Sequence, residues 1–455
     1  MRISVYSIWG NLLLASVLTF ALSGTLSAQY QEMPVDDSLA SQKDAVIRSG
    51  NQEDIRNFLN KYYLARWTIR ENFRQIYQFR KDLSQDVASL SGQSKKNCQN
   101  VLVEVLAEMT RNNQLAPAVR YNTALLLGSL NDQENDPATP YADALPTMLS
   151  FLSADAQSPD YVILAILINL DRYAALGIAD PAQKKEAIQA LVEVLEPAYG
   201  KKRGFNEDVT TWLQLKAVEG LSEFHSASGG AEGTVILDTF LRLLTDKSVD
   251  SMIQGNALRG IGGIDFEGMD QYDFAPLVTV IARYAVEVCR KESTFIDEEN
   301  IRNQVSVTST ARTGATGGRG GVDSSGVETV VARVKFDLDN LRQGISGTSG
   351  RGGVLARLTA ENQAPLKEAL EAILEKIDET NNYLDFGEQA LQKTFDLKEA
   401  RKQLAQQTKR GGGMAYMVNS LQIQDYINDQ IPFYQDLVDS LSGPEETLEP
   451  EPTNK

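Results

Sequence analysis

Apolar residues recur along much of the chain with the period of an α-helix. In residues 118–130 the recurring positions form a stripe of Val119, Thr123, Leu127 and Leu130. A stripe with this spacing gives a helix one face that can pack on a neighbour and an opposite face that stays polar. Pro117 stands just before it, and proline is well tolerated in a first helical turn. The pattern predicts an amphipathic helix that opens at this proline.

The same stripe returns three times further along the chain. The later copies are Val162, Ile166, Leu170 and Tyr173, then Leu213, Ala217, Leu221 and Phe224, then Ile253, Ala257, Ile261 and Ile264. Their first members follow one another at steps of 43, 51 and 40 residues. Each copy also follows another apolar-striped segment. The chain therefore repeats a helical hairpin of about 40 residues, the size of a helical repeat unit.

This hairpin resembles the HEAT repeat. The second helix of that family often reads V-R-x-x-A-A-x-A-L-G-x-L, which Val119-Arg120, Leu127-Gly128 and Leu130 match, while the later copies keep the apolar skeleton and lose the arginine. The resemblance covers about residues 100–265. It implies stacked helix pairs that form a curved solenoid with a binding surface, and it implies no chemistry.

A fifth copy follows after an insertion. Its stripe is Val330, Val334, Leu338 and Leu341, and its first helix is expected over 274–289. The step from Ile261 to Leu338 is 77 residues, which is one repeat plus an insertion that we place at about 292–326. Within it, 308–326 contains six glycines among nineteen residues and few large apolar side chains. Such a segment cannot bury enough surface to order itself, so we expect disorder there.

Two chemical interpretations of the glycine-rich stretch fail. A phosphate-binding loop needs a lysine after its last glycine, whereas Arg319 is followed by Gly320 and the next lysine is Lys335. Arg-Gly-Gly triplets at Arg319, Arg351 and Arg410 suggest single-stranded RNA, but the first two lack stacking aromatics, and a net charge of −17 repels polyanions. We expect no nucleotide cofactor and no nucleic-acid partner.

The first 28 residues have the layout of a secretory signal peptide. Arg2 precedes an apolar run from Leu12 to Leu22, and small residues follow up to Ala28. The run is shorter than the roughly 20 apolar residues that a membrane span needs. We expect cleavage near Ala28, export to the periplasm or the extracellular space, and no stable membrane insertion.

One segment reverses the acidic balance of the chain. Residues 56–81 hold seven basic residues, one acid and seven aromatics. Arg66, Arg70 and Arg74 are four apart, which predicts one basic face of a helix, and Trp67, Tyr62 and Tyr63 could stack on sugar rings. Two interpretations stay open, namely a site for an envelope polysaccharide or other anionic polymer, and an N-terminal cap with buried aromatics. We favour the cap, because aromatics at helical spacing are usually buried.

The sequence contains no recognisable catalytic motif. The chain holds one histidine, His225, and two cysteines, Cys98 and Cys289, and no triad, metal cluster or cofactor loop is recognisable. The acidic stretch 265–273 lacks the ligand order of a calcium-binding EF-hand. We expect no metal, no cofactor and no enzymatic activity, although chemistry carried by carboxylates alone would leave no linear trace. The two cysteines are expected to be buried in helix packing and unpaired.

These patterns predict an all-α protein, a curved α-solenoid of about five HEAT-like hairpins with flanking N- and C-terminal helices. The expected segments are a signal peptide at 1–28, a flexible linker at 29–50, an N-terminal helical hairpin at 51–95, HEAT-like repeats at 96–345, a C-terminal helical region at 354–442, and a disordered acidic tail at 443–455. The expected function is that of an exported, non-enzymatic scaffold that binds a protein partner on its solenoid surface. The alternative is a polymer-binding module that works through the basic, aromatic N-terminal hairpin.

Overall fold

The computed structural model describes residues 30–227, 234–267, 269, 271–311, 324–348, 352–359, 363–409 and 418–442. The predicted signal peptide and acidic tail lie outside these residues. Within them the fold is all-α apart from a short antiparallel hairpin of β1 (Asn131–Gln133) and β2 (Thr139–Pro140). The chain divides into two compact units, 1–130 and 131–455, and the boundary falls inside the segment predicted to hold the repeats.

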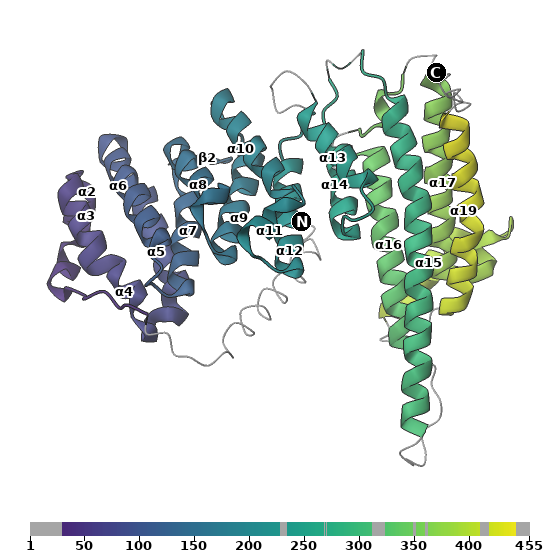
Figure 1. Ribbon diagram of the computed structural model, residues 1–455, viewed down its shortest axis with the longest axis horizontal. Helices are drawn as coiled ribbons and strands as arrows, with labels where there is room; N and C mark the ends of the chain where they lie inside the picture. The colour runs from purple at the N-terminus through teal and green to yellow at the C-terminus, as the bar shows by residue number, and fades with distance from the viewer. Residues whose placement is uncertain are drawn as a thin grey trace, which may run out of the picture. The chain divides into compact units, whose positions relative to one another are not determined.

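The first unit is built from short helices that pack on one long hairpin. It contains η1 (Asp37–Gln42), α2 (Lys43–Ser49), α3 (Gln52–Phe58), η2 (Leu59–Tyr63), α4 (Ala65–Thr68), η3 (Arg70–Gln75), α5 (Ile76–Ala88), α6 (Gly92–Arg111) and α7 (Pro117–Ser129). Helices α6 and α7 pack on each other, and α3 and α5 pack against that pair (Figure 1). Pro117 opens α7 as predicted.

The predicted flexible linker at 29–50 is corrected by this unit. Residues 37–49 form η1 and α2, and α2 packs on α3 and α6 through the buried side chain of Ile47. Asp36 starts η1 by accepting a hydrogen bond from the backbone N–H of Ser38, and Gly50 ends α2 in the left-handed conformation. Local capping and one apolar anchor thus order a segment whose composition is mostly polar.

The second unit begins with helix pairs arranged in two rows. The first row is η4 (Ala142–Ala144) with α8 (Leu145–Leu152), then α10 (Pro181–Val194), α13 (Val235–Thr245) and α15 (Ala275–Ala311); the second row is α9 (Asp160–Leu176), α12 (Glu207–Ser222), α14 (Ser251–Gly263) and α16 (Ser324–Ser346). Each helix of a row packs on the next in that row and on its hairpin partner (Figure 1). Every member of the predicted stripes is buried, which confirms the hairpins and their apolar faces.

One short helix, which lies between α10 and α12 along the chain, has no counterpart in the predicted repeat. The third copy carries α11 (Ala198–Arg203) between its two helices, which accounts for the longest step of the repeat. Tyr199 donates a hydrogen bond to the carbonyl oxygen of Leu152 at 3.2 Å, and the Arg203 guanidinium binds the same carbonyl. The insertion therefore satisfies carbonyl groups at the end of α8, which the helix itself leaves unpaired.

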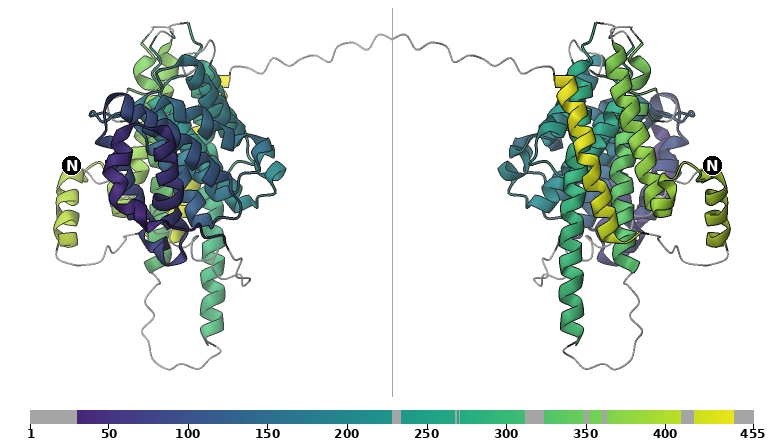
Figure 2. Two further views of the ribbon diagram at one scale, coloured as in Figure 1. Left: turned by 90° about the vertical axis from the view of Figure 1, so that its left-hand side faces the viewer. Right: turned by 90° about the vertical axis from the view of Figure 1, so that its right-hand side faces the viewer.

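The last helices form a bundle. Helices α15, α16, α17 (Ala364–Phe386) and α19 (Ser420–Ser442) lie side by side, while η8 (Gly387–Leu391) and α18 (Leu397–Lys409) follow α17 (Figures 1 and 2). Most of the packing of α19 is on α15, so α15 belongs both to the first row and to the bundle. The predicted C-terminal helical region is confirmed as helical.

The predicted insertion at 292–326 needs correction. Helix α15 continues without a break to Ala311, 37 residues in all or about 55 Å, and α16 already begins at Ser324. The sequence from Cys289 to Ala311 contains neither glycine nor proline, so nothing stops a helix that packing has already nucleated. The disorder predicted at 308–326 falls mainly on 312–323, which lie outside the described residues.

Candidate functional site

The aromatic residues of the predicted N-terminal site are mostly buried. The Trp67 side chain is fully enclosed, and Tyr63 is buried with its hydroxyl donating to the carbonyl oxygen of Phe79 at 3.2 Å. Tyr62 is half-buried and packs against Phe58. Of these three rings, Trp67 and Tyr63 are core side chains of the first unit, as the cap interpretation expects, and neither offers a face for sugar stacking.

The basic residues of this segment do not form the predicted helical face. Helix α4 ends at Thr68, Ile69 is extended, and Arg70 opens a 3-10 turn. The Asn72 amide donates to the carbonyl oxygen of Arg66 at 2.9 Å, which closes the end of α4. The break puts Arg66 on α4 and Arg74 on η3. The prediction that an arginine at every fourth residue would line one face of a single helix is therefore wrong. The capping bond from Asn72 is local, and the backbone N–H of Arg70 after the break also donates to the distant Glu32 side chain at 3.1 Å.

The Arg66 guanidinium is used in packing. It lies over the rings of Phe79 and Tyr62, with its central carbon 4.5 Å and 5.3 Å from their centroids. Arg70 and Arg74 are exposed, and the backbone N–H of Arg70 donates to Glu32. The structure therefore does not bring the three arginines together with the three aromatics as one surface.

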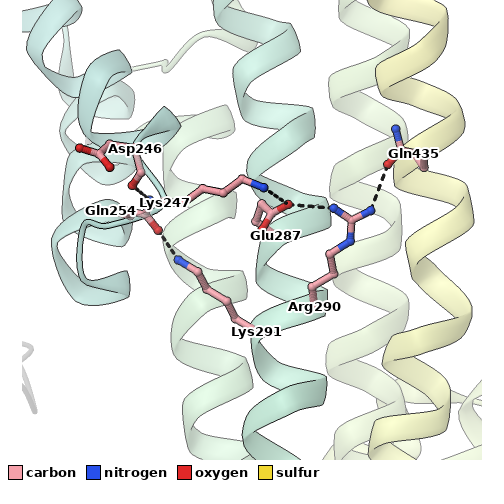
Figure 3. Close-up of polar contacts among 7 residues, drawn as sticks. All are labelled: Asp246, Lys247, Gln254, Glu287, Arg290, Lys291 and Gln435. Atoms are coloured by element: carbon pink, nitrogen blue, oxygen red, sulfur yellow. Dashed lines mark hydrogen bonds and ion pairs between the residues drawn. The ribbon is translucent and has the colours of Figure 1, made fainter.

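A better candidate lies in the second unit. A groove of about 340 Å³ runs along α15 between the α13–α14 connection and α19 (Figure 3). Its lining combines five charged residues, five apolar or aromatic ones and three neutral polar ones: Leu244, Thr245, Lys247, Gln254, Val280, Arg283, Tyr284, Val286, Glu287, Arg290, Lys291, Gln435 and Val438. We call this the α15 groove. Its volume falls in the range of small-molecule sites.

Helical periodicity on α15 places most of the charges in the groove. Arg283, Glu287, Arg290 and Lys291 are spaced by four, three and one residues, so they lie on one side of the helix. Lys247 reaches in from the α13–α14 connection, and Gln435 comes from α19 on the other wall (Figure 3). Three separate elements thus converge on one strip of surface.

Glu287 is the central carboxylate of the α15 groove. Its Oε1 is 2.8 Å from the Arg290 guanidinium and 3.8 Å from Lys247 Nζ. Arg290 also reaches the side-chain oxygen of Gln435 on α19 at 3.4 Å. Lys247 is 82% exposed, so its contact with Glu287 costs little to break. Glu287 therefore already offsets part of the positive charge of these two cations.

Gln254 on α14 connects the end of α13 with α15. Its side-chain amide donates to the carbonyl oxygens of Leu243 at 3.2 Å and Asp246 at 3.0 Å, which end α13. Its side-chain oxygen accepts a hydrogen bond from Lys291 Nζ at 2.5 Å. A glutamine on a helix is expected to face water, and no sequence signal indicated that this one is buried. It keeps Lys291 at the groove.

The charges of the α15 groove do not balance. Four cations line it, Lys247, Arg283, Arg290 and Lys291, against the carboxylate of Glu287. The Asp246 carboxylate points away from the groove (Figure 3) and accepts hydrogen bonds from Ser248. Arg283 and Lys291 have neutral acceptors, the Ser442 hydroxyl and Gln254. The lining is positive in a chain whose net charge is −17.

A buried acid cluster lies next to this strip in the bundle. Glu292 follows Lys291, is fully buried, and accepts hydrogen bonds from Arg333 Nε at 2.8 Å and 3.0 Å. Asp337, one turn further along α16, is also buried beside Glu292. Burial, then the neighbouring Glu292 charge, raise the pKa of Asp337 to about 8. Asp337 is therefore harder to ionise than an ordinary aspartate, and it forms a hydrogen bond with Glu292.

The structure suggests neither a metal centre nor a membrane span among the residues it describes. No three histidine, cysteine, aspartate or glutamate side chains gather there as metal ligands would. None of the described helices combines the length and apolar character needed to cross a bilayer. Asp265, from the acidic stretch considered for calcium, pairs with Arg357 at 2.8 Å.

Comparison with known proteins finds no match, whether with family models, with curated proteins or with solved structures. The candidate site therefore stands on the geometry of this chain. The α15 groove escaped sequence reasoning because its residues come from three segments, 244–254, 280–291 and 435–438, which share no linear motif. The sequence feature that could have indicated the groove is the excess of basic residues on one helical face of 283–291.

Proposed function

We propose that this chain is a non-enzymatic interaction scaffold, a HEAT-like α-solenoid that binds a protein partner across the second helices of its hairpins. The support is structural. Helices α9, α12, α14 and α16 pack successively on one another, and repeated helix pairs of this kind present a continuous surface for partners. The function that such a surface serves is recognition.

The observation that carries the proposal is a row of large side chains at one repeat position. Tyr161, Trp212 and Met252 each stand one residue before the first member of their buried stripe, so they occupy equivalent places on adjacent helices. Trp212 is 38% exposed and Met252 is 47% exposed, while Tyr161 is half-buried. Aromatic and methionine side chains are enriched where proteins bind one another. An apolar row across helices indicates a protein partner.

The proposal is tested by comparing which partners the wild-type protein and a surface variant retain. The chain from residue 29 onward is immobilised, and partners from its own cell envelope are compared between the wild type and the double variant Trp212→Ala, Met252→Ser. Loss of central aromatic and apolar contacts typically costs a binding surface more than 2 kcal/mol, so we expect retention of the specific partner to fall at least about 30-fold.

The matched control changes Gln189 and Glu193 to Ala. Both are exposed on α10, in the first row of helices. We expect this variant to retain the partner as well as the wild type does, and circular dichroism should show full helix content in both variants. Equal retention by the Trp212/Met252 variant and the wild type would contradict the proposal.

A further inference from the structure

We propose that the α15 groove binds a small organic dianion, a molecule with two carboxylate or phosphate groups and an apolar middle. This site is separate from the row of second-helix side chains and does not depend on the scaffold proposal. It rests on three observations, namely the charge of the lining, the arrangement of the cations, and the apolar side chains between them.

The charge of the lining calls for an anion. The other cross-helix ion pairs of the bundle match a cation with its own carboxylate, as Lys335 does with Asp385 and Arg342 with Asp378. In the α15 groove, two of the four cations share Glu287, and the other two donate hydrogen bonds to neutral oxygens. One of these two, Lys291, also lies near the buried Asp337. The Ser442 hydroxyl and the Gln254 amide offer these cations a hydrogen bond without a negative charge, whereas a ligand carboxylate or phosphate adds the attraction between opposite charges, so it would displace these neutral partners.

The cations lie at two ends of the groove. Arg283 and Lys291 are eight residues apart on α15, which is about 12 Å along the helix axis. Arg283 points to the end of α19 at Ser442, whereas Lys291 is held by Gln254 at the α13–α14 side. Two acidic groups joined by a spacer fit this separation better than a single compact anion.

The spacer would lie against apolar side chains. Leu244 from α13, Val438 from α19 and the buried ring of Tyr284 line the groove between the two ends. Glu287 also lies in the middle, which disfavours a third acidic group there because like charges repel. The lining therefore selects a ligand that is charged at its ends and apolar between them.

Isothermal titration calorimetry of the full chain with defined probes tests this inference. The probes are octanedioate, which has two carboxylates and an apolar middle, 1,8-octanediol, which has the same chain without charge, and pyrophosphate, which is a compact polyanion without an apolar spacer. We expect saturable binding of octanedioate that weakens as NaCl rises from about 0.05 M to about 0.5 M, because salt screens exposed charges. We expect no binding of the diol.

The variant Arg283→Gln, Lys291→Gln removes one cation from each end. It should weaken octanedioate binding at least about tenfold, since two charge-assisted contacts are lost. The matched control Lys367→Gln, Lys402→Gln removes two exposed lysines from α17 and α18, outside the groove, and should stay within about twofold of the wild type. Circular dichroism establishes that each variant is folded.

A further control tests whether acidic residues at the C-terminus of the chain compete with the probe for the α15 groove. Residues 443–455 follow α19 and contain Glu445, Glu446, Glu449 and Glu451. Each titration is repeated with these four residues changed to Gln, and groove-dependent binding in either background supports the inference. Absence of octanedioate binding in both backgrounds would overturn it, as would equal weakening in the Lys367/Lys402 control. If pyrophosphate bound as tightly as octanedioate, the inference that the ligand needs an apolar spacer would be wrong.

Discussion

Asp337 is a buried carboxyl group whose pKa lies well above the ordinary value. It lies in the bundle core next to Glu292, which in turn is held by Arg333, while Lys291 and Tyr284 stand on the α15 side of the same cluster. Two buried carboxyl groups this close cannot both be ionised at low cost. Burial and the Glu292 charge therefore raise the pKa of Asp337 from 3.8 to about 8, whereas Arg333 and Lys291 oppose the shift. The folded state therefore binds a proton at Asp337 more tightly than the unfolded state does.

Replacing Asp337 by Asn should remove a pH-dependent loss of stability. Between pH 4 and pH 8 the folded state keeps a proton that the unfolded state releases, so the free energy of unfolding of the wild type falls as pH rises through this window. Asparagine has no proton to lose and can still donate to Glu292. The melting temperature of Asp337→Asn relative to the wild type should rise by on the order of 5 °C from pH 5 to pH 9.

The control for this experiment is Asp436→Asn, which removes one exposed carboxylate from α19. Its melting temperature should differ from the wild type by a constant amount over the same pH range. Thermal unfolding followed by circular dichroism measures both variants. Parallel curves for Asp337→Asn and the wild type would mean that Asp337 is already ionised in the folded protein.

Helices α14 and α16 approach each other unusually closely, and glycines make this contact possible. A methyl group on Gly262 would collide with the carbonyl oxygen of Gln343, and one on Gly344 would come within 2.6 Å of Leu258. Gly255 faces Asn340 in the same way. These glycines cost helix propensity in their own helices, yet they let two backbones pack where the second row meets the bundle.

Gly262→Ala should therefore destabilise the second unit although alanine is the better helix former. The collision involves backbone on α16, which cannot rotate away, and overpacking of this kind costs roughly 1–3 kcal/mol. Gly220→Ala in α12 is the matched control, because its new methyl group would meet Asp171 and Leu191 at ordinary contact distances of 3.5 Å and 3.7 Å. Alanine there should be neutral or stabilising by up to about 1 kcal/mol.

Urea denaturation measures the free energy of unfolding of both variants. The two substitutions are chemically identical and both lie inside helices, so the difference between them isolates the close approach of α14 and α16. A Gly262→Ala variant as stable as Gly220→Ala would show that these helices can separate without cost.

Across the whole chain, the two cysteines belong to different compact units. Cys98 lies in α6 of the first unit and Cys289 in α15 of the second, and both are buried as predicted. Burial raises the pKa of each thiol to about 12. A thiol in this state is a poor nucleophile, since the reactive form is the thiolate. A bond between them would require both side chains to leave their cores.

We therefore expect both cysteines to persist as free thiols in the folded protein. Iodoacetamide at pH 8 should leave the native chain unmodified and should modify both residues after unfolding in guanidinium chloride. Mass spectrometry of the unreduced protein is the readout. A linked peptide that joins Cys98 to Cys289 in the monomer would contradict this expectation.

Sequence patterns predicted the helices of the repeat with few errors and missed the candidate site. Stripes such as Val162, Ile166, Leu170 and Tyr173 predicted buried faces correctly, because a helix with an apolar stripe must bury it whatever its neighbour is. The basic face through Arg66 and Arg74 was wrong, because periodicity assumes an unbroken helix and the backbone turns at Ile69. Apolar periodicity does not reveal that the Asn72 side chain binds the end of α4 or that Arg70 binds Glu32 after the break.

The all-α class, the hairpin repeat and the burial of its stripes were thus encoded locally, in residues within one helical turn of each other. The α15 groove was decided by tertiary packing, because Lys247, Glu287 and Gln435 come from three elements and gain their relation when α19 packs on α15. The glycine contact of α14 with α16 was also decided by packing, whereas the continuation of α15 to Ala311 agrees with a local sequence that lacks glycine and proline. A periodic sequence specifies which face a helix buries, whereas the partner of that face is chosen by the assembled chain.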